Sequence, residues 1–343
     1  MIGLALGQIF FGPLSDKYGR RPLLLVSMLL FIVSTLFCLF APDIYSFVTL
    51  RLIQGIAGAG GIVISRSVAI DKFSGKELAK MLAVIGAING VAPVAAPVIG
   101  GLLTGSVGWQ GIFMILLFIG ILLGIGCIRF KESLPAEKRS KTGVWATFRS
   151  FGIIVHNRRY MLYVFQLAFA QGILFAYIAS SPFIIQQHYG FSPFAFSICF
   201  AVNAVAIGVA AALSVKFRRT ENGTLTGCVG MLVFAVLQMA ALYSGCGFWT
   251  YELLMFALLF MMGLTFTAST TLAMDCERRY AGAASALLGA LCFASGGIVS
   301  PLVGLGDILI STGVTFVICA VCSLLCALWA VKRTGPKVAL CRI

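Results

Sequence analysis

The fold can be read outward from one stretch near the start of the chain, Gly12-Pro13-Leu14-Ser15-Asp16-Lys17-Tyr18-Gly19-Arg20-Arg21-Pro22. It lies between two apolar runs, so it predicts a short charged loop between two helices. Gly12 and Gly19 permit a close approach and a tight turn. Asp16 and Arg20 are four residues apart, so they can form an ion pair or cap a neighbouring helix end. Two interpretations stay open here: a loop with a fixed partner, or a positively charged anchor and nothing more.

The composition predicts a helical protein that crosses a membrane many times. Hydrophobic residues make up 60% of the chain and charged residues 10%, with a mean hydropathy of +1.03, which excludes a soluble class. The net charge of +14 does not predict nucleic-acid binding. Apart from Arg51, the Lys and Arg residues fall in alternate connections and at the C-terminus, which is the positive-inside pattern of membrane topology.

Eleven apolar spans are expected, each of roughly 20 residues except a shorter first one. The connections between them alternate between basic segments, expected in the cytoplasm, and segments without Lys or Arg, expected outside. The predicted spans are 1–12, 22–41, 44–66, 79–104, 107–129, 160–184, 192–215, 223–244, 249–274, 282–305 and 308–331.

One long basic connection divides the spans into five and six. We therefore predict an N-terminal helical half over 1–130, a cytoplasmic linker over 131–159, and a C-terminal half over 160–343 with a short cytoplasmic tail. Two unequal halves suggest a plan of six and six spans, so we expect a further span before Met1.

Arg51 is the one basic side chain expected well inside a span, about 10 Å from its outer end. An arginine inside a membrane is costly and is by default a candidate functional residue facing the bundle interior. The alternative is that it reaches the outer membrane interface. Gln54 lies on nearly the same helix face.

The span 79–104 is rich in proline and glycine. Pro93 and Pro97 weaken the helical hydrogen bonds and predict a bend. Glycines spaced by four residues let another helix press against that bend, and a merely structural kink is the alternative. The residues expected to form it are Gly90, Pro93, Pro97, Gly100 and Gly101.

Uncharged polar and aromatic side chains within the spans are candidates for lining a substrate cavity. For each one alone, packing between helices is the stronger interpretation. The candidates are Gln54, Asn89, Phe165, Gln166, Phe169, Tyr177, Asn203 and Gln238.

No Asp or Glu lies in the middle of any of the eleven predicted spans, and Glu252 and Asp275 fall near span ends. Proton coupling needs a titratable group in a low-dielectric site, so we expect the coupling carboxylate in the missing first span. The sequence has no nucleophile–base pair, phosphate-binding loop or metal-ligand cluster. It therefore predicts no enzyme activity, no metal and no cofactor.

Three motifs together resemble the major facilitator superfamily. Residues 12–21 are similar to its cytoplasmic signature G-x-L-x-D-x-x-G-R-[KR], and Arg51-Leu52-Ile53-Gln54-Gly55 resembles its R-x-x-Q-G element. Ala96-Pro97-Val98-Ile99-Gly100-Gly101 resembles the G-P-x-x-G-G element of antiporters, with Ala in place of the first Gly. With Ala281-Gly282-Ala283-Ala284-Ser285-Ala286, the set is most similar to the bicyclomycin-resistance (Bcr/CflA) type of drug:proton antiporter.

The resemblance implies an all-α membrane fold of two helical bundles, with 11 of 12 transmembrane helices present, and roles for several residues. Asp16, Arg20 and Asp71 would form a charge cluster that docks onto the helix beginning near Gly282 and holds an inner gate shut. The other residues of this signature loop are Gly12, Gly19 and Arg21. Arg51 would communicate with the proton-binding carboxylate, and the Pro93–Pro97 region would form the bend of exporters.

We expect a multi-pass, monomeric protein of the bacterial inner (plasma) membrane that exports small lipophilic drug-like molecules in exchange for protons, by alternating access. Two other hypotheses stay open: a facilitator for a polar metabolite such as a sugar or an amino acid, and a remnant inactive in transport. The expected partners are the substrate, protons and the lipid bilayer, with no nucleic acid.

Overall fold

The computed structural model describes residues 1–73, 75–135, 137, 139, 151–214, 217, 219–277 and 281–332; side chains are described for only part of 75–106 and not for 281 and 282. The regular structure in these ranges is helical. Contacts divide the chain into two compact units. The first unit is Met1–Gly152 with Gly282–Ala294, and the second is Ile153–Ala281 with Ser295–Ile343.

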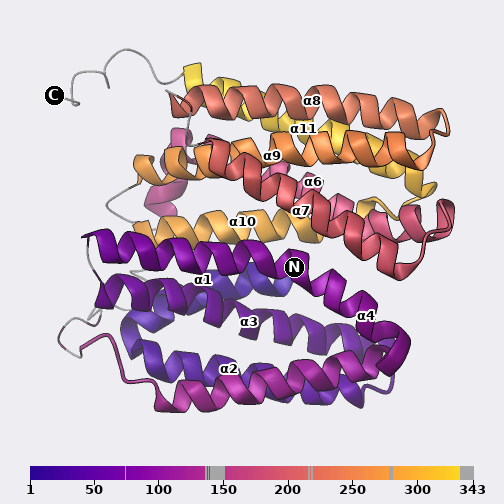
Figure 1. Ribbon diagram of the computed structural model, residues 1–343. Helices are drawn as coiled ribbons and strands as arrows, with labels where there is room; N and C mark the ends of the chain where they lie inside the picture. The colour runs from indigo at the N-terminus through magenta and orange to yellow at the C-terminus, as the bar shows by residue number, and fades with distance from the viewer. Residues whose placement is uncertain are drawn as a thin grey trace. The chain divides into compact units, whose positions relative to one another are not determined.

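The first unit contains α1 (Ile2–Tyr18), α2 (Arg20–Leu39), α3 (Ile44–Lys72) and α4 (Gly75–Arg129), together with the first part of α10 (Ala281–Leu302). Helix α3 packs against both α1 and α2, and α4 packs against α2 (Figure 1). Helix α4 is two helices joined at Gly108, whose φ of 63° suits glycine. The contact between α1 and α3 is close, because a Cβ at Gly7 would lie 2.4 Å from the carbonyl oxygen of Ile56.

The second unit contains the remaining elements and the end of α10. These are α6 (Arg158–Pro182), a π-helical turn η2 (Phe183–His188), α7 (Pro193–Ser214), α8 (Thr220–Tyr243), α9 (Phe248–Cys276) and α11 (Ile308–Lys332). Helix α9 packs against α6, α7 and α8, and α11 packs against α6 and α8. Four large tyrosines are almost fully buried inside this unit: Tyr160, Tyr163, Tyr177 and Tyr251.

Short polar side chains fix the start of several helices. The carboxylate of Asp43 accepts from the backbone N–H of Ser46 at 2.7 Å at the start of α3. Asn157 does the same for the N–H of Tyr160 at 3.2 Å at the start of α6. A side-chain oxygen at this position satisfies one of the backbone donors that the first helical turn leaves unpaired. These caps explain why apolar helices begin at defined residues.

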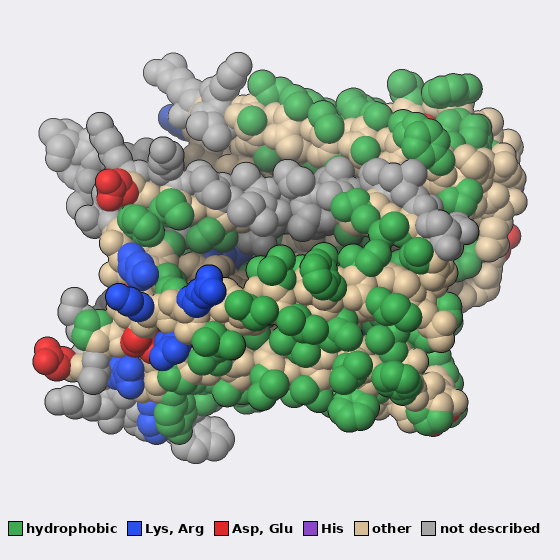
Figure 2. All heavy atoms as spheres, turned by 60° about the horizontal axis from the view of Figure 1, so that its bottom comes forward, with side chains coloured by type: hydrophobic (Ala, Val, Ile, Leu, Met, Phe, Trp, Pro, Cys, Tyr) green, Lys and Arg blue, Asp and Glu red, His purple; other side chains and the backbone are tan. Residues whose placement is uncertain are grey.

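Nine helices among the described residues are long and apolar enough to cross a membrane. Of the two other predicted spans, α1 has 17 residues, and 79–104 has few described side chains. Figure 2 shows hydrophobic side chains over much of the visible surface of the first unit, with Lys and Arg side chains gathered at one end. A surface of this kind fits hydrocarbon along the helices and water at their basic ends.

The predicted loop between the first two spans is wrong in extent. Helix α1 continues to Tyr18 with Pro13 inside it, and α2 begins at Arg20, so Gly19 alone connects the two helices. Similarly, α3 continues to Lys72 and carries Arg66, which was expected in a loop. Hydropathy marks where apolar residues end, whereas a helix continues for as long as its backbone hydrogen bonds do.

Candidate functional site

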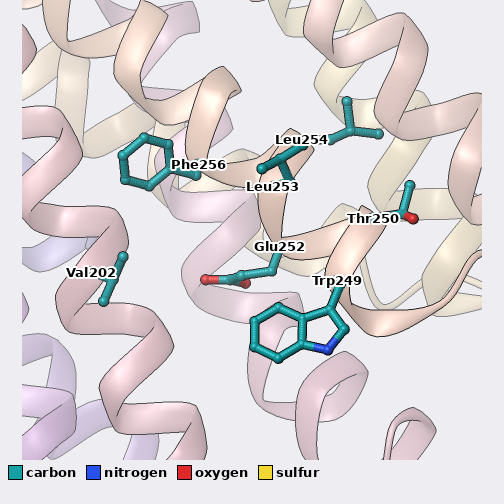
Figure 3. Close-up of a pocket in the computed structure, with 7 residues that line it drawn as sticks. All are labelled: Val202, Trp249, Thr250, Glu252, Leu253, Leu254 and Phe256. Carbon is teal, nitrogen blue, oxygen red and sulfur yellow. The ribbon is translucent and has the colours of Figure 1, made fainter.

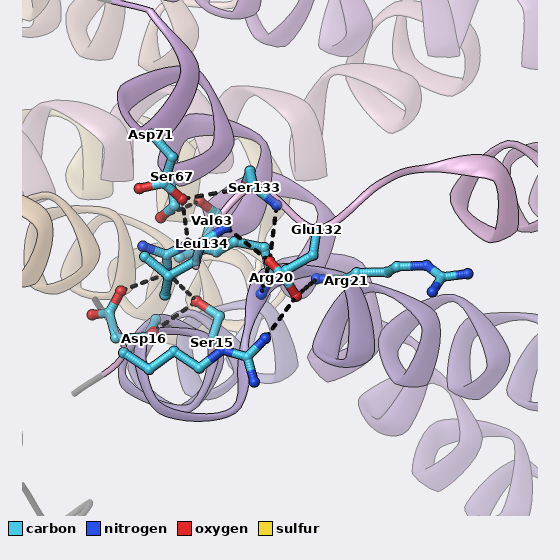
Figure 4. A network of polar contacts seen from close by, with 12 residues as sticks. Ser15, Asp16, Arg20, Arg21, Val63, Ser67, Asp71, Glu132, Ser133 and Leu134 are labelled. Atoms are coloured by element: carbon cyan, nitrogen blue, oxygen red, sulfur yellow. Dashed lines mark hydrogen bonds and ion pairs between the residues drawn. The ribbon is translucent and has the colours of Figure 1, made fainter. Parts of the chain in front are cut away.

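A cluster of charged side chains, here called the charged corner, lies where α1, α2 and α3 meet. It is centred on Arg20, the first residue of α2, which is 6% exposed. The guanidinium pairs with Asp16 through Nη1 at 2.5 Å and with Asp71 through Nε at 2.9 Å. Nη1 also donates to the hydroxyl of Ser15 at 2.7 Å. The predicted ion pair between Asp16 and Arg20 is therefore confirmed, and Asp71 joins it from the end of α3 (Figure 4).

A buried arginine is tolerated only when its charge and its N–H groups are satisfied. Here two carboxylates and one hydroxyl surround it. The hydroxyl of Ser133, which follows α4, also donates to Asp71 at 3.2 Å. The corner therefore joins α1, α2, α3 and the segment after α4 through one hydrogen-bonded network.

Glu132 is a member of the corner that sequence reasoning missed. Its carboxylate accepts from the backbone N–H groups of Arg20 at 3.0 Å and Arg21 at 3.2 Å, so it caps the start of α2 from 112 residues away. It also accepts from the N–H groups of Ser133 and Leu134, each at 3.0 Å. Burial by itself raises the pKa of Glu132, but these four backbone donors outweigh burial and hold its pKa below the ordinary value. The one available signal was an acid directly after an apolar span.

Gly19 is required at this corner for two reasons. Its φ of 101° lies in the region that favours glycine, and a Cβ there would lie 2.5 Å from Oε2 of Glu132 and 2.9 Å from Nη2 of Arg139. Arg139 itself lies 3.6 Å from the same carboxylate. Arg21 donates through Nη2 to the carbonyl of Ile128 at 2.9 Å, at the end of α4. The predicted signature residues Gly19, Arg20 and Arg21 thus all contact or face the segment that follows α4.

The first part of α10 belongs to the first unit and meets α1 and α3 at single residues. The guanidinium of Arg66 in α3 donates to the hydroxyl of Ser285 at 3.4 Å. A Cβ at Gly289 would lie 2.0 Å from the amide oxygen of Gln8, and a Cβ at Gly12 would lie 3.9 Å from that of Ala286. The side-chain surroundings of Gly282 lie outside the described residues, so docking at that residue stays a prediction.

Arg51 is exposed on α3 and bonded within its own unit. Its Nη1 donates to the amide oxygen of Gln54 at 2.6 Å, and its guanidinium lies 5.4 Å from the ring centroid of Phe113. The amide nitrogen of Gln54, which is buried, donates to the hydroxyl of Thr35 at 2.6 Å. Arg51 therefore belongs to a polar chain that links α3 to α2, and its predicted role in proton coupling stays a prediction.

The predicted bend of the fourth span falls mostly outside what is described. The backbone is helical through Gly90, Pro93, Pro97 and Gly101, and the surroundings of these four residues lie outside the described set. A Cβ at Gly100 would meet no atom of the described residues within 4 Å. Asn89 also lies among the residues whose side chains are outside the described set. The bend stays a prediction.

Most of the predicted cavity residues of α6, α7 and α8 lie buried inside the second unit. Gln166 donates to the hydroxyl of Ser323 at 3.1 Å, and Gln238 is fully buried. Tyr177 and Asn203 are brought together by a hydrogen bond of 3.0 Å. Phe165 is 41% exposed and Phe169 is partly buried.

Residues 1–301 match the family described as Major Facilitator Superfamily. An uncharacterized MFS-type transporter, YdgK of Bacillus subtilis, is 38% identical over 314 residues, which are 90% of this chain and 78% of that protein. A bicyclomycin resistance protein homolog of Haemophilus influenzae is 29% identical over 315 residues, 88% of this chain and 77% of that protein.

A solved structure supports the fold independently. The xylose transporter XylE from E. coli, in a partially occluded inward-open conformation, matches with a TM-score of 0.72. The match covers 97% of this chain and 86% of that chain at 17% identity. At this identity the likeness establishes the fold alone.

Proposed function

The chain belongs to the Major Facilitator Superfamily, and on that premise we propose that it exports small drug-like or antibiotic molecules in exchange for protons, by alternating access. It is a multi-pass transporter of the bacterial inner (plasma) membrane. The observation that carries the proposal is the similarity to a bicyclomycin resistance protein homolog along most of the chain. The proposed substrates are lipophilic, and the proposed working form is a monomer.

In this proposal, the charged corner stabilises one of the two access states. Arg20 holds the ends of α1 and α3 together through Asp16 and Asp71. The first part of α10 lies against the same two helices through Gln8 and Arg66. We propose that opening of the inner gate separates α10 from these helices, and that the corner sets the free-energy cost of that step. Two-state elements of this kind give a transporter its alternating access.

Transport by the purified chain in proteoliposomes tests the proposed function. Radiolabelled bicyclomycin, a lipophilic cationic dye, xylose and alanine would each be presented with and without a pH gradient. We expect the antibiotic or the dye to move against its gradient when protons flow the other way, and a protonophore to abolish that movement. Transport of xylose or alanine would instead support the facilitator. A folded chain that moves none of the four would support the inactive remnant.

A further inference from the structure

A groove in the second unit runs between α7 and α9 and has a glutamate in its wall. Its volume is about 510 Å³. Glu252 is the fifth residue of α9, and Figure 3 shows its carboxylate pointing from α9 toward the helix that carries Val202, between Trp249 and Phe256. The other walls are almost entirely apolar. The lining residues are Val202, Trp249, Thr250, Glu252, Leu253, Leu254 and Phe256.

Glu252 is held by an asparagine from the neighbouring helix. The amide nitrogen of Asn203, midway along α7, donates to Oε1 of Glu252 at 2.8 Å. The same nitrogen donates to the hydroxyl of Tyr177 on α6 at 3.0 Å, so both of its hydrogens are used. Asn203 is fully buried, and the Tyr177 ring is stacked on Phe200 with 5.2 Å between centroids. Three helices therefore fix the orientation of this amide.

Two oxygen atoms next to this bond lack a partner. Oε2 of Glu252 and Oδ1 of Asn203 are both buried, and neither has a hydrogen-bond partner in the part of the chain that the structure describes. Each is an acceptor when the carboxylate is ionised, so neither can satisfy the other. Leaving a buried polar atom unpaired is costly, and the cost is larger for a charged group.

A proton on Oε2 resolves both deficits at once. It turns Oε2 into a donor, and a carboxylic acid and a primary amide each present one donor and one acceptor side by side. The protonated acid and the amide can then form a reciprocal pair in which Oε1 accepts from Nδ2 and Oε2 donates to Oδ1. The ionised carboxylate has no such arrangement.

No cationic side chain among the described residues neutralises the carboxylate of Glu252 in place of a proton. The titratable side chains that interact with the charge of Glu252 are Tyr177 from α6, Cys199 from α7 and Tyr251 from α9 itself. Helix α8, which also packs against α9, contributes none among its described residues. Within the described ranges, no Lys, Arg or His forms an ion pair with Glu252. A carboxylate in apolar surroundings without a counter-ion is costly, and a proton removes that cost.

We propose that Glu252 and Asn203 form a proton-binding site in the second unit, with the groove as the route by which the proton exchanges. The inference deepens the proposed function and rests on it for its role in transport. Sequence reasoning expected the coupling carboxylate in a span before Met1. The geometry instead offers a carboxyl within this chain.

Infrared difference spectroscopy of the full chain in lipid nanodiscs measures proton occupancy without requiring transport. The expected result is a carboxylic-acid C=O band at neutral pH that Glu252→Gln removes. Glu77→Gln, which changes an exposed glutamate in the first turn of α4, is the matched control and leaves the band in place. A band that survives Glu252→Gln, or a wild-type chain that has no such band at neutral pH, overturns the proposal.

Asn203→Leu provides a second variant of similar size, in case Glu252→Gln does not fold. Removal of the amide is expected to shift the acid band to higher frequency, because the carbonyl loses its hydrogen bond. An unshifted band in folded Asn203→Leu contradicts the pairing. If the Glu252 band is present but no drug is transported, the proton site is supported and the proposed export is contradicted. If proton-driven export occurs without this band, only the proposed proton site is contradicted.

Discussion

The charged corner of the first unit and Glu252 of the second unit differ in how completely their charged groups are paired. At the corner, the buried Arg20 has two carboxylates and a hydroxyl within bonding distance, and Glu132 accepts from four backbone donors. Glu252 accepts from one amide donor, and no Lys, Arg or His in the described part of the chain forms an ion pair with it. One of its carboxylate oxygens has no hydrogen-bond partner among the described residues. Both regions lie on helices that enter a membrane, where an unpaired charge is expensive.

A fully paired network of charges and an incompletely paired acid are suited to different roles. A fully paired network fixes the ends of helices and favours one arrangement of them. A carboxylate with one oxygen that lacks a hydrogen-bond partner destabilises the folded chain. Such a destabilising group is expected where a proton or a ligand binds. We therefore propose that the corner biases the conformational equilibrium and that Glu252 binds the proton.

Substitution of Arg20, the central residue of the charged corner, is expected to change the free energy of unfolding the most. Arg20→Ala leaves Asp16, Asp71 and Ser15 without their shared donor, so we expect the free energy of unfolding in detergent to fall by about 3 kcal/mol. Arg139→Ala is the control, because Arg139 is a third exposed and lies 3.6 Å from Glu132. Its loss is expected to cost less than about 1 kcal/mol. Equal effects of the two substitutions in a thermal denaturation assay would show that the corner is not a buried network.

Substitution of the helix cap sharpens the comparison with a pH dependence. Glu132→Gln loses the charge at the start of α2, and we expect the free energy of unfolding to fall by about 1 kcal/mol at neutral pH. The pKa of Glu132 is lowered in the folded chain, so its stabilisation is present above the ordinary glutamate value of about 4.3. It is lost as the pH falls through the folded value.

The measurement is therefore the gap between wild type and Glu132→Gln across an acid titration. The gap is expected to close as the pH falls below about 4. A gap that is constant with pH would mean that the charge of Glu132 does not contribute, and that only its shape matters.

The helices were largely predictable because long apolar runs have no other stable form in a bilayer. The predicted spans 192–215 and 308–331 differ from α7 and α11 by one residue at most. The helix ends near the charged corner were not predictable. Gly19 ends α1 through its backbone conformation and not through a change in hydropathy.

The polar pairings were predictable only where the residues are close in sequence. Asp16 and Arg20 share a helical spacing, whereas Glu132 reaches Arg20 across 112 residues and Asn203 reaches Glu252 across 49. Asp71 was expected at the corner through family resemblance. Glu252 was judged by its distance from a span end, which does not reveal that α7 brings an amide to it.

The most direct test of the account compares drug efflux from cells that express wild type, Asp16→Asn or Asp43→Asn at equal levels in the membrane. Asp16 pairs with the buried arginine. Asp43 is fully exposed and caps α3, with a pKa held below its ordinary value by the backbone N–H and hydroxyl of Ser46. We expect Asp16→Asn to lower efflux strongly and Asp43→Asn to have the smallest effect of all these changes. Unchanged efflux in Asp16→Asn, or an equal loss in both variants, would contradict the role of the charged corner in transport.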